Sequence, residues 1–382
     1  MEKFYFTEQK AEVKETFRRA RYYFSSSQTT NQKENRTMIQ ICPARAKKKT
    51  VVPLPGYLCE QKIDGQRYII HPGKGCTSRR ISAVTQEYVE KGDRVPHLVG
   101  TAFPQESLLD CEFVSPADIV QVELPGHIWD QLPNHPHHQF IKDLGYLPVY
   151  PHVSSTTSIM GSDAREALRK QSLCGQIWAY CFDILQFKGQ STTRSSQLAR
   201  RRFLASQLEG IDPKRGLILM PQWTSLNADD QQLLFDLITE PGGEGIILKD
   251  PGAPYNAPSN WFKWKKDFPV DAVLTGAYDW GTGKLEGLLG SLEIGVYRAG
   301  VLYPVGNISA IMDSESKLVD LTANRAKLRG LVVECRHNGK QTKKSAPLGF
   351  TLRHPRFRFW RDDKNATDCT VEALLNELSV GR

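Results

Sequence analysis

The chain has 382 residues, of which 40% are hydrophobic and 24% charged, as in ordinary soluble globular proteins. This length suits two or three domains of about 100–200 residues each. No apolar run approaches the ~20 residues of a membrane-spanning helix, and the N-terminus lacks the apolar core of a signal peptide. The composition therefore argues against a membrane protein and against a secreted one, and we expect a cytoplasmic protein.

The eight cysteines are scattered singly, with no CxxC pair. This pattern argues against a zinc ribbon and against a disulfide framework, and it favours reduced thiols. The histidine cluster "NHPHH" (His135, His137, His138) lies among prolines and polar residues. We expect a loop there rather than a metal site.

The net charge of +8 is concentrated at the N-terminus: residues 1–50 hold twelve Lys and Arg against five Glu, a net charge of +7. A basic arm of this kind suits a polyanion, because neutralising phosphates releases counterions. The alternative is a solvated tail without a partner.

In chain order, residues 7–24 have the composition of a helix, and "SSSQTTNQKENRT" with "PARAKKKTVVPLPG" suits a linker. From about residue 51, short apolar runs predict strands. These runs are "RYIIH", "SLLDCEFV", "IWAYCFDILQF" and "GIILKD". Between the last two, "TRSSQLARRRFLASQLEG" and "NADDQQLLFDLITE" predict helices, and "SDAREALRKQ" suits another.

The pattern changes after "WKKDF". From Pro269 onward the chain holds Gly-punctuated strand-type runs, interrupted by one predicted helix around "MDSESKLVDLTANRAKL". About 110 residues of this kind suit a small β-barrel of the OB type.

The octapeptide "EQKIDGQR" (residues 60–67) places a lysine, an acid, a glycine and an arginine close together. By itself it suits a charged turn, since Asp-Gly is a common turn pair. Five further segments decide otherwise. They are "LLDCEFV", "AYCFDILQFKG", "EGIILKD", "WFKWKKDF" and "LRHPRFRFWRDDK".

In order and spacing, these six segments resemble the motifs of the nucleotidyltransferases that pass through a lysine–AMP intermediate, and in particular the ATP-dependent DNA ligases. The resemblance covers roughly residues 51 to 370. It implies an α+β fold. A nucleotidyltransferase (ATP-grasp-like adenylation) domain of antiparallel sheets with flanking helices would span residues 51–267. An OB-fold β-barrel would span 268–382, after the basic arm at 1–50. Since only about 50 residues precede the core, we expect the small form without the large N-terminal helical DNA-binding domain, as in small viral, phage or bacterial ligases; a viral source would place it in the host cytoplasm.

The resemblance implies that Lys62 is the nucleophile that takes AMP, that Glu60 contacts the adenine, and that Arg67 holds the ribose and phosphates. Arg79 matches the family's second arginine, although the adjacent Arg80 leaves the register open. A phosphoramidate needs a neutral amine, so we expect nearby positive charge or desolvation to lower the pKa of Lys62.

"LLDCEFV" matches the family's D-G-E strand, and period-2 alternation points Asp110 and Glu112 to one face. Glu112 would bind ribose or Mg²⁺. Cys111 replaces the family's glycine, and we expect it to add bulk beside the nucleotide while leaving the carboxylates in place.

Phe182 would stack on the adenine, although without its neighbours it suits an ordinary core residue. Glu244 would be a second Mg²⁺ ligand, and Lys249 follows it in the same segment. Lys263 and Lys265, two residues apart on one strand face, would contact the α-phosphate, where charge develops as pyrophosphate leaves.

The last segment resembles the C-terminal ligase motif. The matching residues are Arg353, Pro355, Arg356, Phe357, Arg361, Asp363 and Lys364, whereas His354 replaces a Phe and Phe359 stands where an Arg is usual. We expect Arg356, Arg361 and Lys364 to bind the phosphates of ATP. "GTGKLEGLLGSL" also looks like the ligase OB-fold.

The resemblance thus implies a monomeric ligase that seals 5′-phosphate/3′-hydroxyl nicks in duplex DNA, with ATP as AMP donor and Mg²⁺ as cofactor. An RNA ligase or an mRNA capping guanylyltransferase of the same superfamily is the nearest alternative. A non-catalytic nucleic-acid-binding protein with an OB-fold is another, but it would have no reason to keep Lys62 with Glu112 and Glu244. NAD⁺ as donor is disfavoured, because that branch adds a Cys₄ zinc element.

Overall fold

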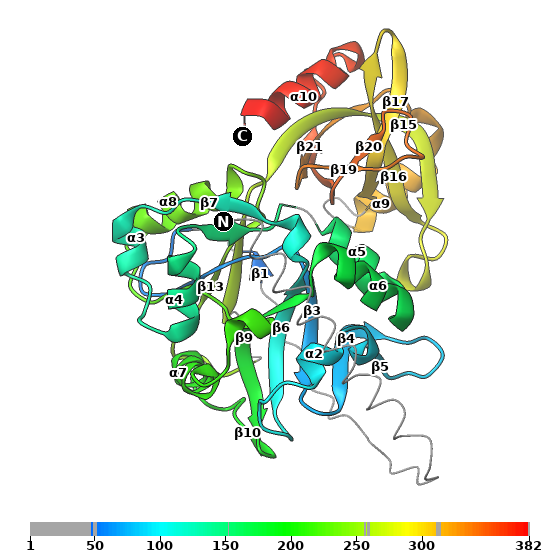
Figure 1. Cartoon of the computed structure of the whole chain (residues 1–382). Helices are drawn as coiled ribbons and strands as arrows, with labels where there is room; N and C mark the ends of the chain where they lie inside the picture. The colour runs from blue at the N-terminus through cyan, green and yellow to red at the C-terminus, as the bar shows by residue number, and fades with distance from the viewer. Residues whose placement is uncertain are drawn as a thin grey trace. The chain divides into compact units, whose positions relative to one another are not determined.

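The structure is a computed structural model that describes residues 47–48, 52–151, 153–255, 257, 260–310 and 315–380. The predicted helix at 7–24 and nearly all of the basic arm lie outside these residues. The chain divides into two compact units between Trp264 and Lys265 (Figure 1).

Two sheets form the frame of the first unit. One has the strand order β1-β14-β13-β2-β12, and the other has the order β10-β9-β6-β3-β4-β5 with β11 beside β9. The first sheet comprises β1 (Lys47–Lys48), β2 (Leu58–Gln61), β12 (Gln222–Trp223), β13 (Gly245–Lys249) and β14 (Trp261–Lys265). The second comprises β3 (Gln66–His71), β4 (Gly75–Ile81), β5 (Tyr88–Glu90), β6 (Leu108–Val114), β9 (Trp178–Phe187), β10 (Gln190–Ser191) and β11 (Leu217–Leu219).

The strand pairs around the predicted motifs are antiparallel, as expected: β2 with β13 and β12, β3 with β6, and β6 with β9. The short pairs β1–β14 and β11–β9 are parallel. A two-stranded sheet of β7 (Val120–Val122) and β8 (Leu147–Val149) lies apart. The predicted strands at "RYIIH", "LLDCEFV", "WAYCFDILQF" and "GIILK" are confirmed.

Alternation along β6 separates two cores. Leu109, Cys111 and Phe113 pack into a cluster with residues of α2, α5, α6 and α7, whereas Leu108 and Val114 belong to a cluster with residues of α3, α4, α8 and the first sheet. Asp110 and Glu112 share the second face. These helices are α2 (Pro96–Val99), α3 (Gly126–Asp130), α4 (Pro136–Asp143), α5 (Ser154–Gly161), α6 (Ala164–Cys174), α7 (Gln197–Leu208) and α8 (Ala228–Thr239).

The helices predicted at α6, α7 and α8 are confirmed, and each begins at a side-chain cap. The loop predicted for "NHPHH" is wrong. Pro136 is the first residue of α4, where its missing N–H costs nothing, and the side chain of His135 caps the helix by accepting from the His137 N–H. No group of three or more His, Cys, Asp or Glu suited to a metal occurs in the described part of the chain.

The second unit is a five-stranded antiparallel sheet of order β17-β16-β15-β18-β21. Its strands are β15 (Phe268–Trp280), β16 (Leu289–Arg298), β17 (Val301–Ser309), β18 (Val332–His337) and β21 (Arg356–Trp360), with a hairpin of β19 (Lys340–Thr342) and β20 (Phe350–Leu352) and helices α9 (Glu315–Ala323) and α10 (Val371–Val380). Thr351 Oγ1 donates to the Val305 carbonyl (2.7 Å), which joins β20 to β17. The unit is an OB-type fold, but β17 and β21 are not hydrogen-bonded neighbours, so the predicted barrel is open rather than closed.

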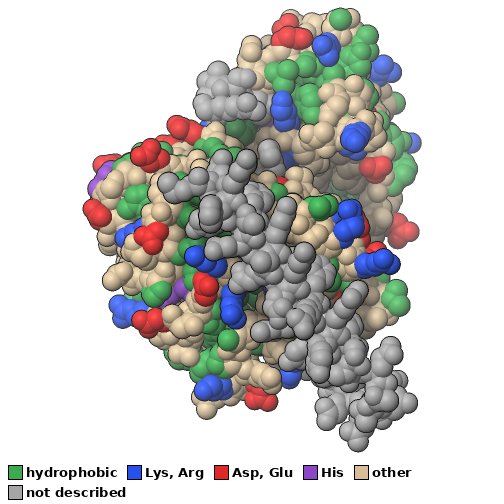
Figure 2. Space-filling model, viewed as in Figure 1, with side chains coloured by type: hydrophobic (Ala, Val, Ile, Leu, Met, Phe, Trp, Pro, Cys, Tyr) green, Lys and Arg blue, Asp and Glu red, His purple; other side chains and the backbone are tan. Residues whose placement is uncertain are grey.

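No described helix is both long and apolar enough to cross a bilayer. On the face drawn in Figure 2, Lys and Arg side chains are interspersed with Asp and Glu. The coloured surface on that face therefore has no large patch of one charge.

Candidate active site

The "KIDG" segment joins β2 to β3 through a turn that packs directly on neighbouring backbone. The Lys62 N–H donates to the Gly245 carbonyl (2.8 Å), so β13 fixes where the lysine leaves the sheet. A Cβ at Gly65 would lie 2.4 Å from the carbonyl oxygen of Phe113, and one at Gly245 would lie 2.1 Å from that of Trp264. Both positions therefore require glycine, and both close approaches set the place of Lys62.

Two carboxylates, Glu112 and Glu244, act on Lys62, and we call these three residues the lysine–carboxylate cluster. The Lys62 ammonium forms an ion pair with Glu244 across 182 residues of sequence. Burial lowers the pKa of Lys62, but the charges of Glu244 and Glu112 outweigh burial and raise it above its ordinary value. The direction is opposite to the lowered pKa expected from the sequence, because the expectation left out two carboxylates that reach the lysine from β6 and from the start of β13.

Burial raises the pKa of Glu112 to about 7, against the opposing charges of Lys62 and Arg67, and the carboxylate of Glu244 adds to the rise. Two carboxylates that repel each other are stabilised by a cation bound between them. Mg²⁺ is commonly held by one or two carboxylates with phosphate oxygens and waters completing its octahedron. The donor set of Glu112 and Glu244 thus fits the predicted metal ligands.

Arg67 is held in a fixed orientation beside this cluster. Its guanidinium makes a two-point ion pair with Asp110, with Nε–Oδ1 at 2.8 Å and Nη2–Oδ2 at 2.5 Å, and Nη2 also lies 3.1 Å from the Tyr255 hydroxyl. The Tyr255 hydroxyl donates to Asp110 (2.8 Å). Burial lowers the pKa of Arg67, but Asp110 more than compensates and raises it. Arg67 is therefore a permanent, pre-oriented cation.

Phe182 and Trp261 form an edge-to-face contact with ring centroids 5.9 Å apart, and we call them the aromatic pair. Two cations lie over both rings. The Arg67 Cζ lies 5.1 Å from the Phe182 centroid and 5.4 Å from that of Trp261, and the Lys249 Nζ lies at 4.8 and 4.4 Å. The structure thus brings Phe182 together with Arg67 and Lys249, two of the predicted nucleotide-binding residues.

Glu60 and Lys249 form a buried ion pair (2.6 Å), and Gln222 Nε2 donates to the second Glu60 oxygen (2.5 Å). Burial lowers the pKa of Lys249, and Glu60 opposes that shift. The Glu60 side chain is 3% exposed, and both of its oxygens are bonded within the protein. The site therefore brings Glu60 and Lys249 together, and Glu60 serves to neutralise the lysine.

The register of β4 separates the two arginines that the sequence left open. Ser78 lies opposite Tyr68, which faces the helix-covered core, so Arg79 shares the face of Arg67. The charge of Arg79 acts on Glu112, whereas that of Arg80 acts on Lys91. The geometry favours Arg79.

The bulk expected of Cys111 beside the nucleotide is not there. Its side chain is fully buried in the opposite core, with its Sγ 3.1 Å from that of Cys181 on β9. Between Asp110 and Cys111 the register with β9 shifts by one, which leaves Phe182 as the extra residue of a bulge. Alternation along β9 puts Cys181 in that core and Phe182 in the other.

Lys263 and Lys265 lie on one face of β14, the strand beside β13. Arg356, Arg361 and Lys364 lie in the second unit, where Asp267, just before β15, and Asp271, on β15, bind them. Arg356 pairs with Asp267 (2.6 Å), and Arg361 and Lys364 share Asp271 (3.0 and 2.6 Å). A hollow of about 290 Å³ in that unit, between α9 and β21, contains none of the predicted residues.

Sequence reasoning missed three residues that support the site of the first unit, Trp261, Tyr255 and Gln222, and it missed Asp271, which binds Arg361 and Lys364 in the second unit. Trp261 directly precedes the predicted "FKWK" alternation, so its position two residues before Lys263 was a usable signal. Tyr255 lies in "PGAPYNAP", where nothing in the sequence marks it.

Comparison with known proteins agrees with this geometry. The sequence model of the family described as "ATP dependent DNA ligase domain" matches residues 42–266. A DNA ligase of Haloarcula marismortui is 27% identical over 84% of this chain and 54% of its own length, and DNA ligase 2 of Korarchaeum cryptofilum is 24% identical over 85% and 56%. The chain thus spans about half the length of these curated relatives.

Among solved structures, a Lig E DNA ligase has the same fold, with a TM-score of 0.55 and 18% identity over 85% of this chain and all of that one. The family match covers more than half of the chain and contains the whole lysine–carboxylate cluster. This chain therefore belongs to the ATP-dependent DNA ligase domain family.

Proposed function

We propose that this protein is a DNA ligase that uses ATP to seal nicks between a 5′-phosphate and a 3′-hydroxyl in duplex DNA. The observation that carries the proposal is the lysine–carboxylate cluster, with the fixed Arg67 and the aromatic pair beside it. One side chain is a nucleophile, two suit a cation, one is a pre-oriented guanidinium, and two rings suit a base. Together they match the needs of nucleotide transfer to an amine.

In the first step, the Lys62 amine attacks the α-phosphorus of ATP, a P–N bond forms, and the bond to pyrophosphate breaks. AMP then passes from Lys62 to the 5′-phosphate of the nick. The 3′-hydroxyl finally attacks that phosphorus and releases AMP. Arg67, Arg79, Lys263 and Lys265 would stabilise the phosphate charge, and Phe182 would stack on the adenine. Lys249, which is buried and paired with Glu60, would support the nucleotide site through its contacts with the aromatic pair.

Glu112 and Glu244 would hold Mg²⁺, which when bound supplies positive charge against the phosphates. The same carboxylates raise the pKa of Lys62. Neutralising their charge would remove that effect and leave burial, which favours the neutral, nucleophilic amine.

We assign nucleotide transfer to the first unit and contacts with DNA and pyrophosphate to the second. The domain boundary proposed from the sequence, residues 267/268, lies three residues from the division between Trp264 and Lys265. Arg356, Arg361 and Lys364 are proposed to bind the departing pyrophosphate.

The test combines labelling and sealing. Incubation with ATP labelled at the α-phosphate should give a covalently labelled protein, and nicked duplex DNA should be sealed with ATP and not with NAD⁺. Nicks with DNA, RNA and hybrid strands separate this proposal from an RNA ligase, and labelling by GTP would indicate a guanylyltransferase. A protein that is never labelled by ATP would contradict the proposal.

A further inference from the structure

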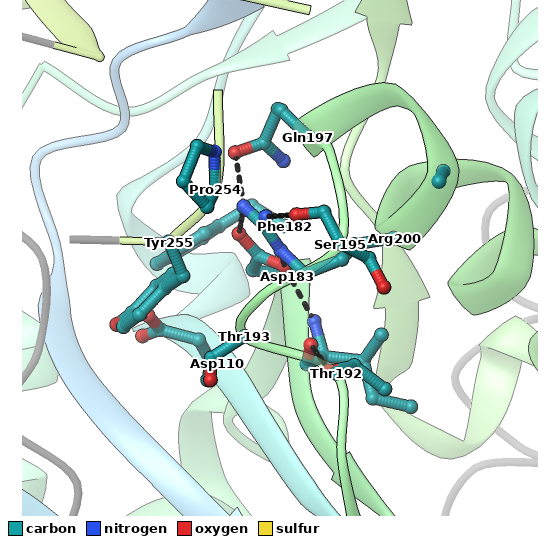
Figure 3. Close-up of polar contacts among 12 residues, drawn as sticks. Asp110, Phe182, Asp183, Thr192, Thr193, Ser195, Gln197, Arg200, Pro254 and Tyr255 are labelled. Carbon is teal, nitrogen blue, oxygen red and sulfur yellow. Dashed lines mark hydrogen bonds and ion pairs between the residues drawn. The ribbon is translucent and has the colours of Figure 1, made fainter. Parts of the chain in front are cut away.

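Gln197, the first residue of α7, is hydrogen-bonded to Trp261 of the aromatic pair and lies outside the motifs. Its side chain is 1% exposed, and its backbone N–H donates to the Ala253 carbonyl (2.8 Å). The side-chain oxygen accepts two hydrogen bonds, from Arg200 Nη2 (2.7 Å) and from the indole Nε1 of Trp261 (2.8 Å). Figure 3 shows Gln197 pointing toward Arg200 and Asp183.

The place of this amide is set by a buried ion pair. Arg200 binds Asp183 through Nε (2.8 Å) and Nη2 (2.9 Å), both side chains are fully buried, and Nη1 donates to the Ser195 carbonyl (2.6 Å). Asp183 directly follows Phe182 on β9. The Arg200–Asp183 ion pair therefore holds Gln197 on one side and the backbone next to Phe182 on the other.

The orientation of the Gln197 amide follows from its neighbours. Arg200 and the Trp261 indole are donors only, so the amide must present its oxygen to both. Its Nε2 is buried and has no hydrogen-bond partner among the described residues. A buried donor without a partner lowers the stability of the fold. The favourable contribution of Gln197 therefore comes from its side-chain oxygen, which accepts both hydrogen bonds.

Trp261 is the residue through which this oxygen reaches the site. Its ring contacts Phe182 edge to face (5.9 Å) and Tyr255 (5.7 Å), and the Nζ of Lys249 lies 4.4 Å from its centroid. Tyr255 in turn binds Asp110, the partner of Arg67. A shift of the indole would therefore displace the surfaces and charges predicted to receive the nucleotide.

We propose that Gln197 is a positioning residue for nucleotide binding, acting through the Trp261 indole. The inference rests on the proposed nucleotide site. Gln197 contacts neither Lys62 nor the carboxylates in the described structure, so it sets affinity for ATP and leaves the rate of transfer from bound ATP nearly unchanged.

The experiment compares Gln197→Leu, which removes the acceptor, with Gln197→Glu, which keeps an oxygen for both donors. Two quantities are measured for each: the dissociation constant of α,β-methylene-ATP, which cannot transfer AMP, and the KM and maximal rate of self-labelling by ATP. Gln197→Leu should raise both the dissociation constant and KM by about tenfold, with less than a twofold change in the maximal rate. Gln197→Glu should restore both to near the wild-type values.

Gln171→Leu is the matched control, because Gln171 is also a buried glutamine of the first unit and bonds only backbone groups of Arg94, Ala167 and Ile177. It should lower the melting temperature without changing the dissociation constant. In a Trp261→Phe background, which lacks the indole N–H, Gln197→Leu should add little further effect on binding.

Three results would overturn the inference: equal nucleotide affinity in Gln197→Leu and wild type, an equal loss in Gln171→Leu, or a full additional loss in the Trp261→Phe background. A wild-type protein that binds the analogue but is never labelled would refute the proposed transfer chemistry. In that case the dissociation constants alone would still decide on Gln197.

Discussion

At the scale of single residues, the lysine–carboxylate cluster shows how its surroundings distinguish one lysine as the proposed nucleophile. Lys62 is one of 50 Lys and Arg residues in the chain. It differs from an ordinary surface lysine because it forms an ion pair with Glu244, the residue before β13, and because the charge of Glu112 on β6 also raises its pKa. Lys62→Ala should abolish covalent labelling by ATP, because the attacking nitrogen is gone. Lys62→Arg should fail too, since a guanidinium does not deprotonate in proteins.

Gel electrophoresis after incubation with α-labelled ATP measures this outcome. Lys74→Ala, at an exposed lysine of the same unit, is the control and should label normally. Covalent AMP that persists in Lys62→Ala would show that another side chain is the nucleophile.

Gly65 gives a prediction about stability at the same scale. A methyl group there would lie 2.4 Å from the Phe113 carbonyl oxygen, which is backbone and cannot turn aside. Gly65→Ala should lower the free energy of unfolding by at least about 2 kcal/mol. Gly210→Ala, where nothing lies within 4 Å of the added carbon, should change it by less than about 1 kcal/mol. Thermal and urea unfolding compare the two, and equal stabilities would refute the close contact.

At the scale of elements, α4 is held to the rest of the first unit by histidines. His138 is 2% exposed, its Nδ1–H donates to the Pro133 carbonyl (2.9 Å), and its Nε2 accepts from Arg201 Nη2 (3.1 Å). Burial and the charge of Arg201 lower the pKa of His138 to about 3. Between about pH 3 and pH 6.5, the ring is therefore neutral in the folded protein and protonated in the unfolded chain.

The sign of the pH effect follows from proton counts. Between the ordinary histidine pKa of 6.5 and about 3, the unfolded state binds one more proton at this residue, so stability falls as the pH falls. His138→Gln, which offers a donor and an acceptor without a titrating ring, should reduce the slope by an amount that approaches roughly 1.4 kcal/mol per pH unit near pH 5. Urea unfolding from pH 6.5 to 5 measures both slopes, and identical slopes would show that His138 is not the neutral ring described.

Helix α4 also shows which parts of the fold and site could be predicted from the sequence and which could not. Strands β3, β6, β9 and β13 were predictable, because period-2 alternation and β-branched residues are local properties. The ligase motifs predicted the chemistry at Lys62. The start of α4 was not predicted, since prolines and histidines suggest a loop until the cap at His135 and the buried partners are known. The raised pKa of Lys62 was not predicted either: the motifs placed Glu112 and Glu244 at the site, but the direct ion pair between Lys62 and Glu244 is known only from the structure.

At the scale of the whole molecule, the last motif allows the steps of the reaction to be separated. If Arg361 binds the departing pyrophosphate, Arg361→Ala should slow self-labelling about 100-fold or more, since one lost donor at developing charge costs that much. The variant should still seal a nick whose 5′ end already carries AMP, because no pyrophosphate leaves in that reaction.

Single-turnover labelling and sealing of a pre-adenylated nick measure the two steps. Arg358→Ala, which removes a neighbouring arginine paired with Glu334, is the control and should label at nearly the wild-type rate. If Arg361→Ala labels normally and fails to seal the pre-adenylated nick, the motif acts on DNA and not on ATP.

The two aspartates that bind the last motif, Asp267 just before β15 and Asp271 on it, have a consequence for how the second unit responds to ionic strength. Arg356, Arg361 and Lys364 are each already matched to Asp267 or Asp271. A phosphate that takes one of these cations releases a counterion from the polyanion, but it also exposes a carboxylate that gathers a cation of its own. The net number of ions released is therefore smaller than the number of basic side chains engaged. The slope of the logarithm of DNA affinity against the logarithm of salt concentration would therefore report the number of phosphates bound minus the number of aspartates left without their cation.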